Sequence, residues 1–497
     1  MTVHVELRRG AYHDSVSLLE VSRAVAGADG VEAAQVAMAT ELNCDVLRGM
    51  GFEVPAGAGP NDLVVALRAV DDEGVAAGLA AVEAGLASLR GAPGTGEGLA
   101  DEVPPMTVGS AVRRSGAGLV LVSVPGAHAV TEAYDALDAG ASVMLFSDNV
   151  SVADEVALKD YAVQRDLLVM GPDCGTAVVG GAALGFADVV RPGPVGIVAA
   201  SGTGAQQVMC LLDAAGVGVS HCLGGGGRDL SAAVGGRSTR QALRALADDP
   251  GTGSVVVVAK PPDDAVLEAV RVDAVTLGLR VHWATLGPGR PDLTAAVETA
   301  LGAEGWAVPE WSHHEAAPED PTLARGRSLR GLFCGGTLAA EAALVAAEVL
   351  GPVETNLGHA PSLPADLRTV GHAVVDYGAD ELTQGRAHPM IDPTLRTERI
   401  AAEAADPSCG ALLLDLVLGH GAHPDPARDL AEAVRAARAT AHASGRALPV
   451  VVSLCGTDAD PQDRVACQRA LAAAGASVFL SNAAAARHAV DVLRRPR

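Results

Sequence analysis

The chain has 497 residues, of which 49% are hydrophobic and only 2% aromatic, and its formal net charge is -24. At about 100–200 residues per domain, this length predicts three or four domains, and the richness in Ala, Val, Leu and Gly favours layered α/β packing. The acidic charge opposes nucleic acid and anionic membranes, so neither is expected as a partner. A small anionic substrate is still compatible with the negative net charge, because helix N-termini and single arginines can attract an anion locally.

The cysteines and apolar runs predict the compartment. Eight cysteines are scattered without a CxxC pair or metal-ligand spacing, and the start of the chain does not read as a signal peptide. The apolar runs 167–170 and 253–259 have strand length and fall short of the roughly 20 residues that a membrane span needs. We expect a reduced, cytoplasmic protein that holds no metal.

In chain order, the first expected unit is a small ferredoxin-like α/β domain, residues 1–90. Hydrophobic periodicity predicts its elements in the order strand, helix, strand, helix, strand, helix. They are expected at 3–8, 16–26, 31–38, 42–50, 63–69 and 73–85. The Gly-rich segment 91–98 then marks a linker.

The next segment alternates strands and helices. The strands are expected at 119–124, 142–146 and 167–170, and the helices at 127–139 and 152–165. Such βαβ units predict a parallel sheet with right-handed crossovers. We interpret residues 110–191 as a Rossmann-like domain.

Two further doubly wound, flavodoxin-like domains are expected at 192–303 and 328–497. Strands of the first are predicted at 195–199, 219–223, 255–259 and 280–284. Strands of the second are predicted at 329–334, 411–417, 450–454 and 477–480. The intervening residues 304–327 carry Pro, His, Glu and Ser without periodicity, which indicates a linker.

Two glycine-rich helix starts are the strongest chemical signal. In each, an apolar strand runs into small residues that open a helix. Backbone N–H groups at a helix start lack intrahelical partners, and the helix dipole favours an anion there, although a tight turn needing only glycine is the alternative. The candidate phosphate-binding residues are Ser201, Gly202, Thr203, Gly204, Gly335, Gly336 and Thr337. The two starts could face one another across an interface and clamp one anion.

A third glycine turn follows the apolar run 412–418. Gly419 and Gly421 are candidate anion-binding residues, with His420 or His423 beside them. Two histidines three residues apart can bind zinc, but no third ligand has a diagnostic spacing, so a metal is not expected.

Two cations stand where parallel strands should end. Arg228 and Asp229 follow four glycines, and Arg228 could bind a carboxylate or phosphate bidentately, or could be a solvated partner of Asp229. Lys260 follows the strand 255–259 at the end of the sheet where α/β proteins bind ligands. Lys159 is the only other lysine, so Lys260 is either a required ammonium or chance.

Two turns complete the candidates. The loop 385–393 combines Arg386, His388 and Asp392, and these residue types are suited to polar substrate binding or acid–base catalysis. The alternative is that these residues are polar only because the loop is exposed to solvent. The turn 171–176 contains Asp173 and Cys174. Cys174 would be nucleophilic only with a lowered pKa, so a structural turn is the main interpretation.

Several ordered motifs together resemble the FdrA family over nearly the whole chain. They are Ser147-Asp-Asn-Val150, Leu168-Val-Met-Gly-Pro-Asp-Cys-Gly-Thr176, Ala200-Ser-Gly-Thr-Gly204, Gly227-Arg-Asp-Leu-Ser231, Gly335-Gly-Thr-Leu-Ala-Ala-Glu341 and His388-Pro-Met-Ile-Asp-Pro-Thr-Leu-Arg396. The family in turn resembles a rearranged succinyl-CoA synthetase. This resemblance implies a CoA-binding-type domain at 110–191 and two synthetase-type domains after it, with Ser201–Thr203 and Gly335–Thr337 facing a phosphoryl group.

The sequence departs from the synthetase in three ways. The glycine-rich first CoA turn has no counterpart before Leu119, which argues against CoA as a cofactor. No Gly-His-Ala-Gly-Ala segment follows Ala284, so the phosphorylated histidine is missing. An ATP-grasp domain and a Walker-type motif are also absent from the sequence.

The FdrA resemblance implies a subunit of oxamate carbamoyltransferase in allantoin breakdown, a reaction of oxalurate and phosphate to oxamate and carbamoyl phosphate. Phosphate would be a substrate, Arg228 or Arg386 would bind the substrate carboxylate, and His388 would shuttle a proton. Partner subunits from the same operon and an oligomer are expected. The alternatives are an NDP-forming acyl-CoA synthetase and a non-catalytic scaffold subunit.

Overall fold

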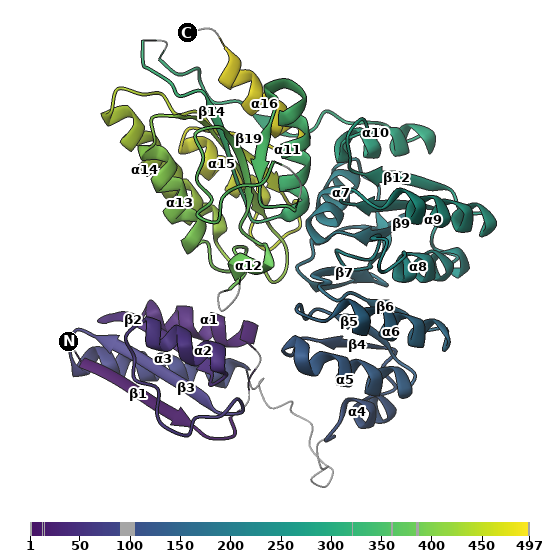
Figure 1. The fold of residues 1–497 in the computed structure, drawn as a ribbon, viewed down its shortest axis with the longest axis horizontal. Coiled ribbons are helices and arrows are strands. Elements are labelled where there is room, and N and C mark those ends of the chain that lie inside the picture. Colours follow the sequence, from purple (N-terminus) through teal and green to yellow (C-terminus); the bar gives the residue numbers. More distant parts are fainter. Residues whose placement is uncertain are drawn as a thin grey trace. The chain divides into compact units, whose positions relative to one another are not determined.

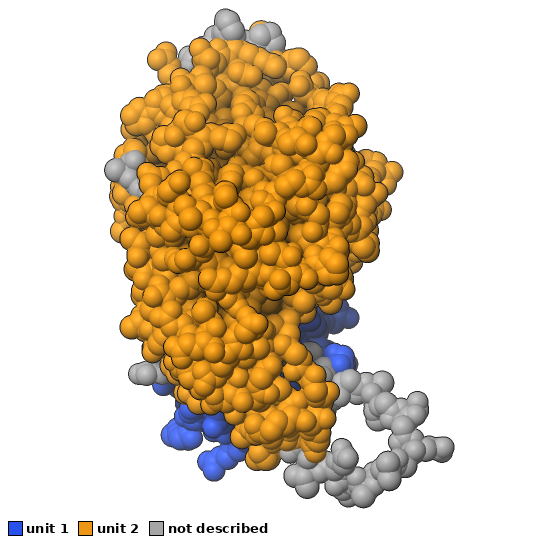
Figure 2. Space-filling view, turned by 90° about the vertical axis from the view of Figure 1, so that its right-hand side faces the viewer, with its two compact units in different colours: residues 1–104, 384–387 blue, residues 105–383, 388–497 orange. Residues whose placement is uncertain are grey.

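The computed structural model describes residues 2–11, 13, 15–89, 105–320, 322–358, 361–383 and 387–495. The chain divides into two compact units, residues 1–104 with 384–387 and residues 105–383 with 388–497, which Figure 2 colours separately. Arg386 lies outside the described residues. Among the described residues, none of the helices combines the length and apolar composition that crossing a bilayer requires.

The first unit is a three-stranded antiparallel sheet with helices (Figure 1). Its elements are β1 (Thr2–Arg8), α1 (Ser15–Ala26), β2 (Val31–Met38), α2 (Glu41–Gly49), β3 (Leu63–Ala69) and α3 (Asp72–Leu89), with sheet order β1-β3-β2. Alternate residues of β3 point to opposite faces. Leu63, Val65 and Leu67 pack with α1 and α3, whereas Val64 and Ala66 pack in a second cluster with Leu47 and Phe52. The predicted α/β order is confirmed.

The second unit begins with a short parallel sheet. Its elements are α4 (Val108–Ser115), β4 (Leu119–Val122), α5 (Gly126–Asp138), β5 (Ser142–Leu145), α6 (Val152–Val163) and β6 (Val169–Met170), with order β4-β5-β6. Both strand pairs are parallel, as the βαβ pattern predicts. Buried alanines and leucines of α5 and α6 cover the sheet.

The next sheet begins earlier in the chain than expected. Its strands are β7 (Thr176–Val179), β8 (Ala182–Gly185), β9 (Pro192–Ala200), β10 (Val219–Gly224), β11 (Ser254–Ala259) and β12 (Val281–Thr285), in the order β12-β11-β9-β10-β7-β8. The hairpin β7–β8 was assigned by sequence to the Rossmann-like domain, but β7 pairs antiparallel with β10. The sheet therefore crosses the predicted boundary at 191/192.

The C-terminal sheet also extends beyond its predicted start. It has the order β13-β19-β18-β17-β14-β16-β15. The strands are β13 (His313–His314), β14 (Ser328–Phe333), β15 (Val353–Thr355), β16 (His372–Asp376), β17 (Cys409–Val417), β18 (Val450–Cys455) and β19 (Ala476–Phe479). β13 lies inside the expected linker 304–327, yet it pairs with β19 as an antiparallel edge strand. The interpretation of that whole segment as a linker was therefore wrong.

Helices pack against these two larger sheets. They are α7 (Gly202–Ala214), α8 (Arg237–Asp248), α9 (Asp264–Thr276), α10 (Leu293–Ala303), α11 (Gly336–Leu350), α12 (Asp380–Thr383), α13 (Thr394–Ala405), α14 (Pro426–Ala443), α15 (Arg464–Ala473) and α16 (Asn482–Arg494). One apolar core runs through α7, α10, α11 and α16 and includes residues of both sheets. Because that core is continuous, the starts of α7 and α11 are held on one rigid interface.

Candidate anion-binding site

The starts of α7 and α11 meet, as the two glycine-rich motifs predict. Oγ of Ser201 lies 2.6 Å from Oγ1 of Thr337, and both side chains are buried. Ser201 is the N-cap of α7, where its hydroxyl accepts a hydrogen bond from the Gly204 N–H at 3.0 Å. A Cβ at Gly335 would lie 2.9 Å from the Thr203 hydroxyl oxygen, so Thr203 packs on the start of α11. The two helix starts are therefore in direct contact.

Lys260 lies at the same helix start. It follows β11, and a Cβ at Gly336 would lie 3.0 Å from its ammonium nitrogen and against a carboxylate oxygen of Asp376. Gly336 is needed because these two charged groups occupy the place of a side chain. Within the described ranges no ion pair or hydrogen bond involves Lys260, which is only partly buried. The nearby Asp376 carboxylate offsets part of the ammonium's charge, but an ammonium outside an ion pair, beside helix N–H groups that lack intrahelical partners, still attracts an anion.

The other lysine has the opposite environment. Lys159 is 1% exposed, and its ammonium donates to Glu155 at 2.7 Å, to Asp229 at 2.8 Å and to the Gly225 carbonyl at 3.0 Å. Of the two lysines in the sequence, Lys260 is thus the one available to a ligand.

The Gly335 N–H is already used by the protein. It donates to Oδ2 of Asp415 at 2.9 Å, and the Cys334 N–H donates to Oδ1 at the same distance. Asp415 is fully buried and also pairs with Arg396 at 2.5 Å. The prediction that Gly335 presents its N–H to phosphate is therefore corrected, because an internal carboxylate holds that amide. A lone Asp inside the apolar strand 409–417 was the available sequence signal.

His388 lies beside the site but is not suited to shuttle protons. Its Nδ1 accepts from the Met390 N–H at 3.2 Å, which leaves the proton of the neutral ring on Nε2. Burial lowers the pKa of His388 to about 4, with the charge of Arg396 as a second cause. Its ring lies 5.7 Å from that of Phe186, which sequence reasoning missed. A ring that stays neutral can donate from Nε2, but it holds no exchangeable second proton near neutral pH.

The turn after β17 is packed rather than open. Gly419 has φ 105, its N–H donates to Gln462 at 3.1 Å, and a Cβ there would lie 2.7 Å from the Ala187 carbonyl oxygen. A Cβ at Gly421 would lie 3.0 Å from Phe186. These contacts explain both glycines by close packing, so the Gly419 amide is not an anion donor. His423 is buried and its Nδ1 accepts from the Asp425 N–H at 2.8 Å.

The Arg228 loop is tied to the protein as well. The Arg228 guanidinium lies 2.9 Å from the Val150 carbonyl and 2.9 Å from Glu155, with 48% of its side chain exposed. Asp229 is fully buried, pairs with Lys159, and accepts from the first residues of α8, Ser238 and Thr239. Asp229 therefore has a structural role, while Arg228 keeps an exposed edge.

The remaining candidates, Asp392, Asp173 and Cys174, lie in turns of the backbone. Asp392 accepts from the Thr394 N–H at 3.0 Å and from its hydroxyl at 2.6 Å, so it stabilises the start of α13. Asp173 is exposed with φ 55, and its N–H donates to the Ser147 carbonyl at 3.0 Å. Cys174 is buried, and burial raises the pKa of its thiol to about 12, which supports the structural interpretation.

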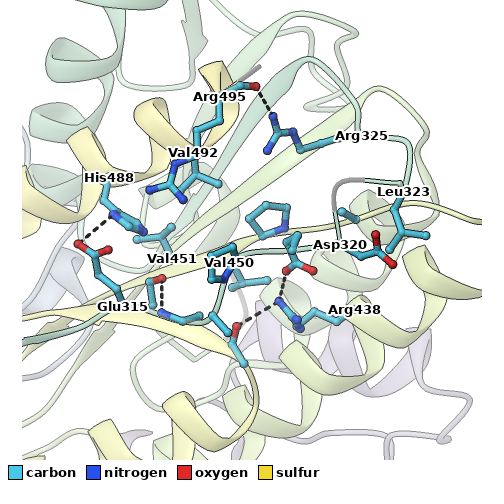
Figure 3. A pocket seen from close by; sticks show the side chains of 18 residues that line it. Glu315, Asp320, Leu323, Arg325, Arg438, Val450, Val451, His488, Val492 and Arg495 are labelled. Atoms are coloured by element: carbon cyan, nitrogen blue, oxygen red, sulfur yellow. Dashed lines mark hydrogen bonds and ion pairs between the residues drawn. The ribbon is translucent and has the colours of Figure 1, made fainter. Parts of the chain in front are cut away.

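A separate cavity of about 150 Å³ lies near the amino ends of β18 and β19 (Figure 3). The start of α11 follows the carboxyl end of β14, so it lies at the other end of this parallel sheet. The charged groups of the cavity already have partners in the protein. Arg438 pairs with Glu319 at 2.5 Å, and His488 lies 3.7 Å from Glu315. The residues that the sequence singled out do not line it.

Comparison with known proteins sets this geometry in a family. The chain is 38% identical over 485 residues to the uncharacterized protein YahF of Escherichia coli (strain K12). The aligned region covers 93% of this chain and 92% of YahF. The chain belongs to the YahF family. Two family models match parts of it, one described as "AllF, heavy metal-associated domain" at residues 1–102 and one as "CoA-ligase" at residues 332–492.

The YahF-family chain is also similar to CoA ligases. The alpha subunit of the ADP-forming succinate–CoA ligase of Aquifex aeolicus is 30% identical over 173 residues, which is 33% of this chain and 55% of that subunit. Among solved structures, a dinucleotide-forming acetyl-coenzyme A synthetase 1 of Ca. Korarchaeum cryptofilum aligns with 81% of this chain and 87% of its own at 15% identity, with a TM-score of 0.31. The similarity to the ligase subunit covers about a third of this chain, and the CoA-ligase model covers residues 332–492.

The residues present do not fit a heavy metal in the first unit. Soft metals are held by several thiolates, whereas residues 1–102 contain the single cysteine Cys44, which is buried. Among residues 2–89, as far as they are described, no cluster of three metal-ligating side chains occurs.

The turn that opens α5 packs closely on the loop at residues 148–149. Gly126 opens α5, and a Cβ there would collide with the carbonyl oxygen of Asp148 and lie 2.8 Å from that of Asn149. Close packing of the backbone therefore explains this glycine.

Proposed function

We propose that this protein is a group-transfer enzyme of the CoA-ligase type that handles an acyl phosphate where α7 and α11 begin. The observation that carries the proposal is the unpaired ammonium of Lys260 beside Gly336, at a helix start that touches its counterpart through Ser201 and Thr337. An ammonium and helix N–H groups are together a typical phosphate site.

The chemistry assigned to this site is acyl transfer between phosphate and a second carrier. A phosphate oxygen attacks the acyl carbonyl, the new C–O bond replaces the bond to the leaving group, and the proton of hydrogen phosphate ends on that group. Lys260 and the Gly336 and Thr337 N–H groups would offset the phosphate charge. Preorganised donors of this kind lower the barrier without reorganisation during the reaction.

Two leaving groups are supported by different observations. The similarity to succinate–CoA ligase and the CoA-ligase match at 332–492 favour the CoA thiolate, so that acyl-CoA and phosphate give an acyl phosphate. The FdrA resemblance and the lack of a glycine-rich first CoA turn before Leu119 favour carbamoyl transfer instead, in which oxalurate and phosphate give oxamate and carbamoyl phosphate.

A binding experiment tests the shared step. Lys260→Met should weaken binding of inorganic phosphate and of carbamoyl phosphate, measured by isothermal titration, by roughly 10- to 100-fold, because a charged hydrogen bond contributes about 1.5–3 kcal/mol. The exposed Arg271→Met on α9 is the control and should bind as wild type does. Equal affinities for wild type and Lys260→Met would reject the site.

A second assay separates the leaving groups. Wild-type protein, with and without the expected partner subunits, is given either succinyl-CoA and phosphate or oxalurate and phosphate, and the products are followed by phosphorus-31 NMR. Formation of succinyl phosphate supports the ligase-type reaction, and formation of carbamoyl phosphate supports carbamoyl transfer. Intact phosphate binding with neither product would contradict both assignments while leaving the anion site standing.

A further inference from the structure

A second cluster of reactive side chains lies inside the second unit, away from the helix starts. Asp188, which follows β8, Cys210 of α7 and Cys455 at the end of β18 each offer a ligand atom, and these atoms lie within 4.8 Å of one another. The two sulfur atoms are 3.8 Å apart. Segments from the β9 and β14 sheets thus converge on one point in the shared core.

No cation of the described chain lies against the carboxylate of this cluster. Asp188 is 0% exposed, and neither of its oxygens takes part in a hydrogen bond within the described part of the chain. It faces Gln206, Cys210 and Asp460. The oxygens of Asp460 are already used, because they accept from the Val189 and Thr457 N–H groups, each at 2.7 Å. An ionised carboxylate is costly to bury without a cation beside it.

A fourth polar atom points to the same place. Gln206 is one helical turn before Cys210 on α7, so both side chains share a face. Its amide nitrogen donates to the Leu418 carbonyl at 3.2 Å, while its Oε1 is buried with no hydrogen bond among the described residues. Two thiols, the Asp188 carboxylate and Gln206 Oε1 therefore surround one buried position.

We propose that Asp188, Cys210 and Cys455 bind a zinc-like divalent cation, with Gln206 Oε1 as the fourth ligand. Around a tetrahedral zinc with Zn–S bonds of about 2.3 Å, two thiolate sulfurs lie about 3.8 Å apart, which is the spacing observed. Both cysteines lose their protons on binding. The ion ties α7 to β18 and stabilises the interface between the two sheets.

This site is distinct from the resemblance of residues 1–102 to a metal-associated domain. Cys44 belongs to the first unit, whereas the cluster belongs entirely to the second. A Cys44→Ser variant therefore serves as a control that removes the one thiol of the first unit.

The test is metal content of the full-length protein, purified without an affinity tag from cells grown with zinc. We expect about one zinc per chain after desalting, and cobalt-grown protein should show thiolate-to-cobalt charge-transfer bands. Cys210→Ser and Cys455→Ser should lose the metal and these bands. Cys44→Ser and the buried, distant Cys409→Ser should retain both.

Wild-type protein alone can also decide the question. X-ray absorption of its zinc form should show two sulfur and two oxygen neighbours, and chelation should lower the melting temperature. A wild-type chain that stays metal-free after growth and refolding with zinc, or one in which Cys210 and Cys455 form a disulfide, would overturn the proposal.

Discussion

At the residue scale, the neighbours of a candidate site residue, rather than its residue type, decide whether it is available to a ligand. Lys159 and Lys260 are chemically identical, but Lys159 has three internal partners and Lys260 has none in the described part of the chain. Asp392 and Asp229 look catalytic in a sequence, yet both accept hydrogen bonds from helix starts. A polar side chain satisfied by the protein cannot at the same time bind a substrate without losing those bonds.

His388 gives a prediction at this scale. Its pKa of about 4 lies below the ordinary 6.5, so the ring stays neutral from pH 8 down to about pH 5. A depressed pKa stabilises the fold above pH 6.5 and ceases to do so as the pH falls toward 4. Nitrogen-15 NMR of the imidazole, assigned against a His388→Gln variant, should therefore show no titration near 6.5. A midpoint near 6.5 would contradict the enclosed, neutral ring, and exposed His128 provides an internal reference.

At the element scale, one carboxyl group of α11 links the starts of two other helices. Glu341 of α11 accepts from the Leu293 N–H that opens α10 at 2.6 Å and from the Asn482 amide that opens α16 at 2.7 Å. Burial raises the pKa of Glu341 to about 7 from the ordinary 4.5. The sequence shows an apolar helix at 336–350. The role of its buried carboxyl, Glu341, depends on two helices whose starts are distant from it in the sequence.

The stability of this junction should depend on pH. Because the folded pKa is raised, the stabilisation is complete below pH 4.5 and is lost as the pH rises through 7. Between pH 5 and 8 the free energy of unfolding should fall by on the order of 2 kcal/mol more in wild type than in Glu341→Gln, measured by urea unfolding. Glu348→Gln, exposed on the same helix, is the control and should keep the wild-type slope. Parallel slopes for wild type and Glu341→Gln would contradict the assignment.

At the scale of the whole molecule, the two units have separate apolar cores. Those of the first unit contain residues 18–86, and the cores of the second contain residues 122–490. All three tryptophans, Trp283, Trp306 and Trp311, belong to the second unit. Units with separate cores unfold separately unless a large interface couples them.

Calorimetry should accordingly show two transitions, of which only one coincides with the change in tryptophan fluorescence. Leu67→Ala removes a fully buried side chain of the first unit and should lower the fluorescence-silent transition, at a cost of about 2–5 kcal/mol. Leu243→Ala is the matching variant in the second unit and should lower the other transition. A single transition that both substitutions shift would show that the units unfold together.

The sequence alone predicts the α/β class, most of the alternating strands and helices and the two glycine-rich helix starts, because periodicity and turn chemistry are local. It could not determine that β7 and β8 join the later sheet, since strand partners are chosen by packing across the fold. Only the tertiary structure decided that Asp415 holds the Gly335 amide, that Lys260 is unpaired, and that Asp188, Cys210 and Cys455 meet. Each of these depends on residues distant in sequence, and the chain must fold before their charges and hydrogen bonds can be assigned.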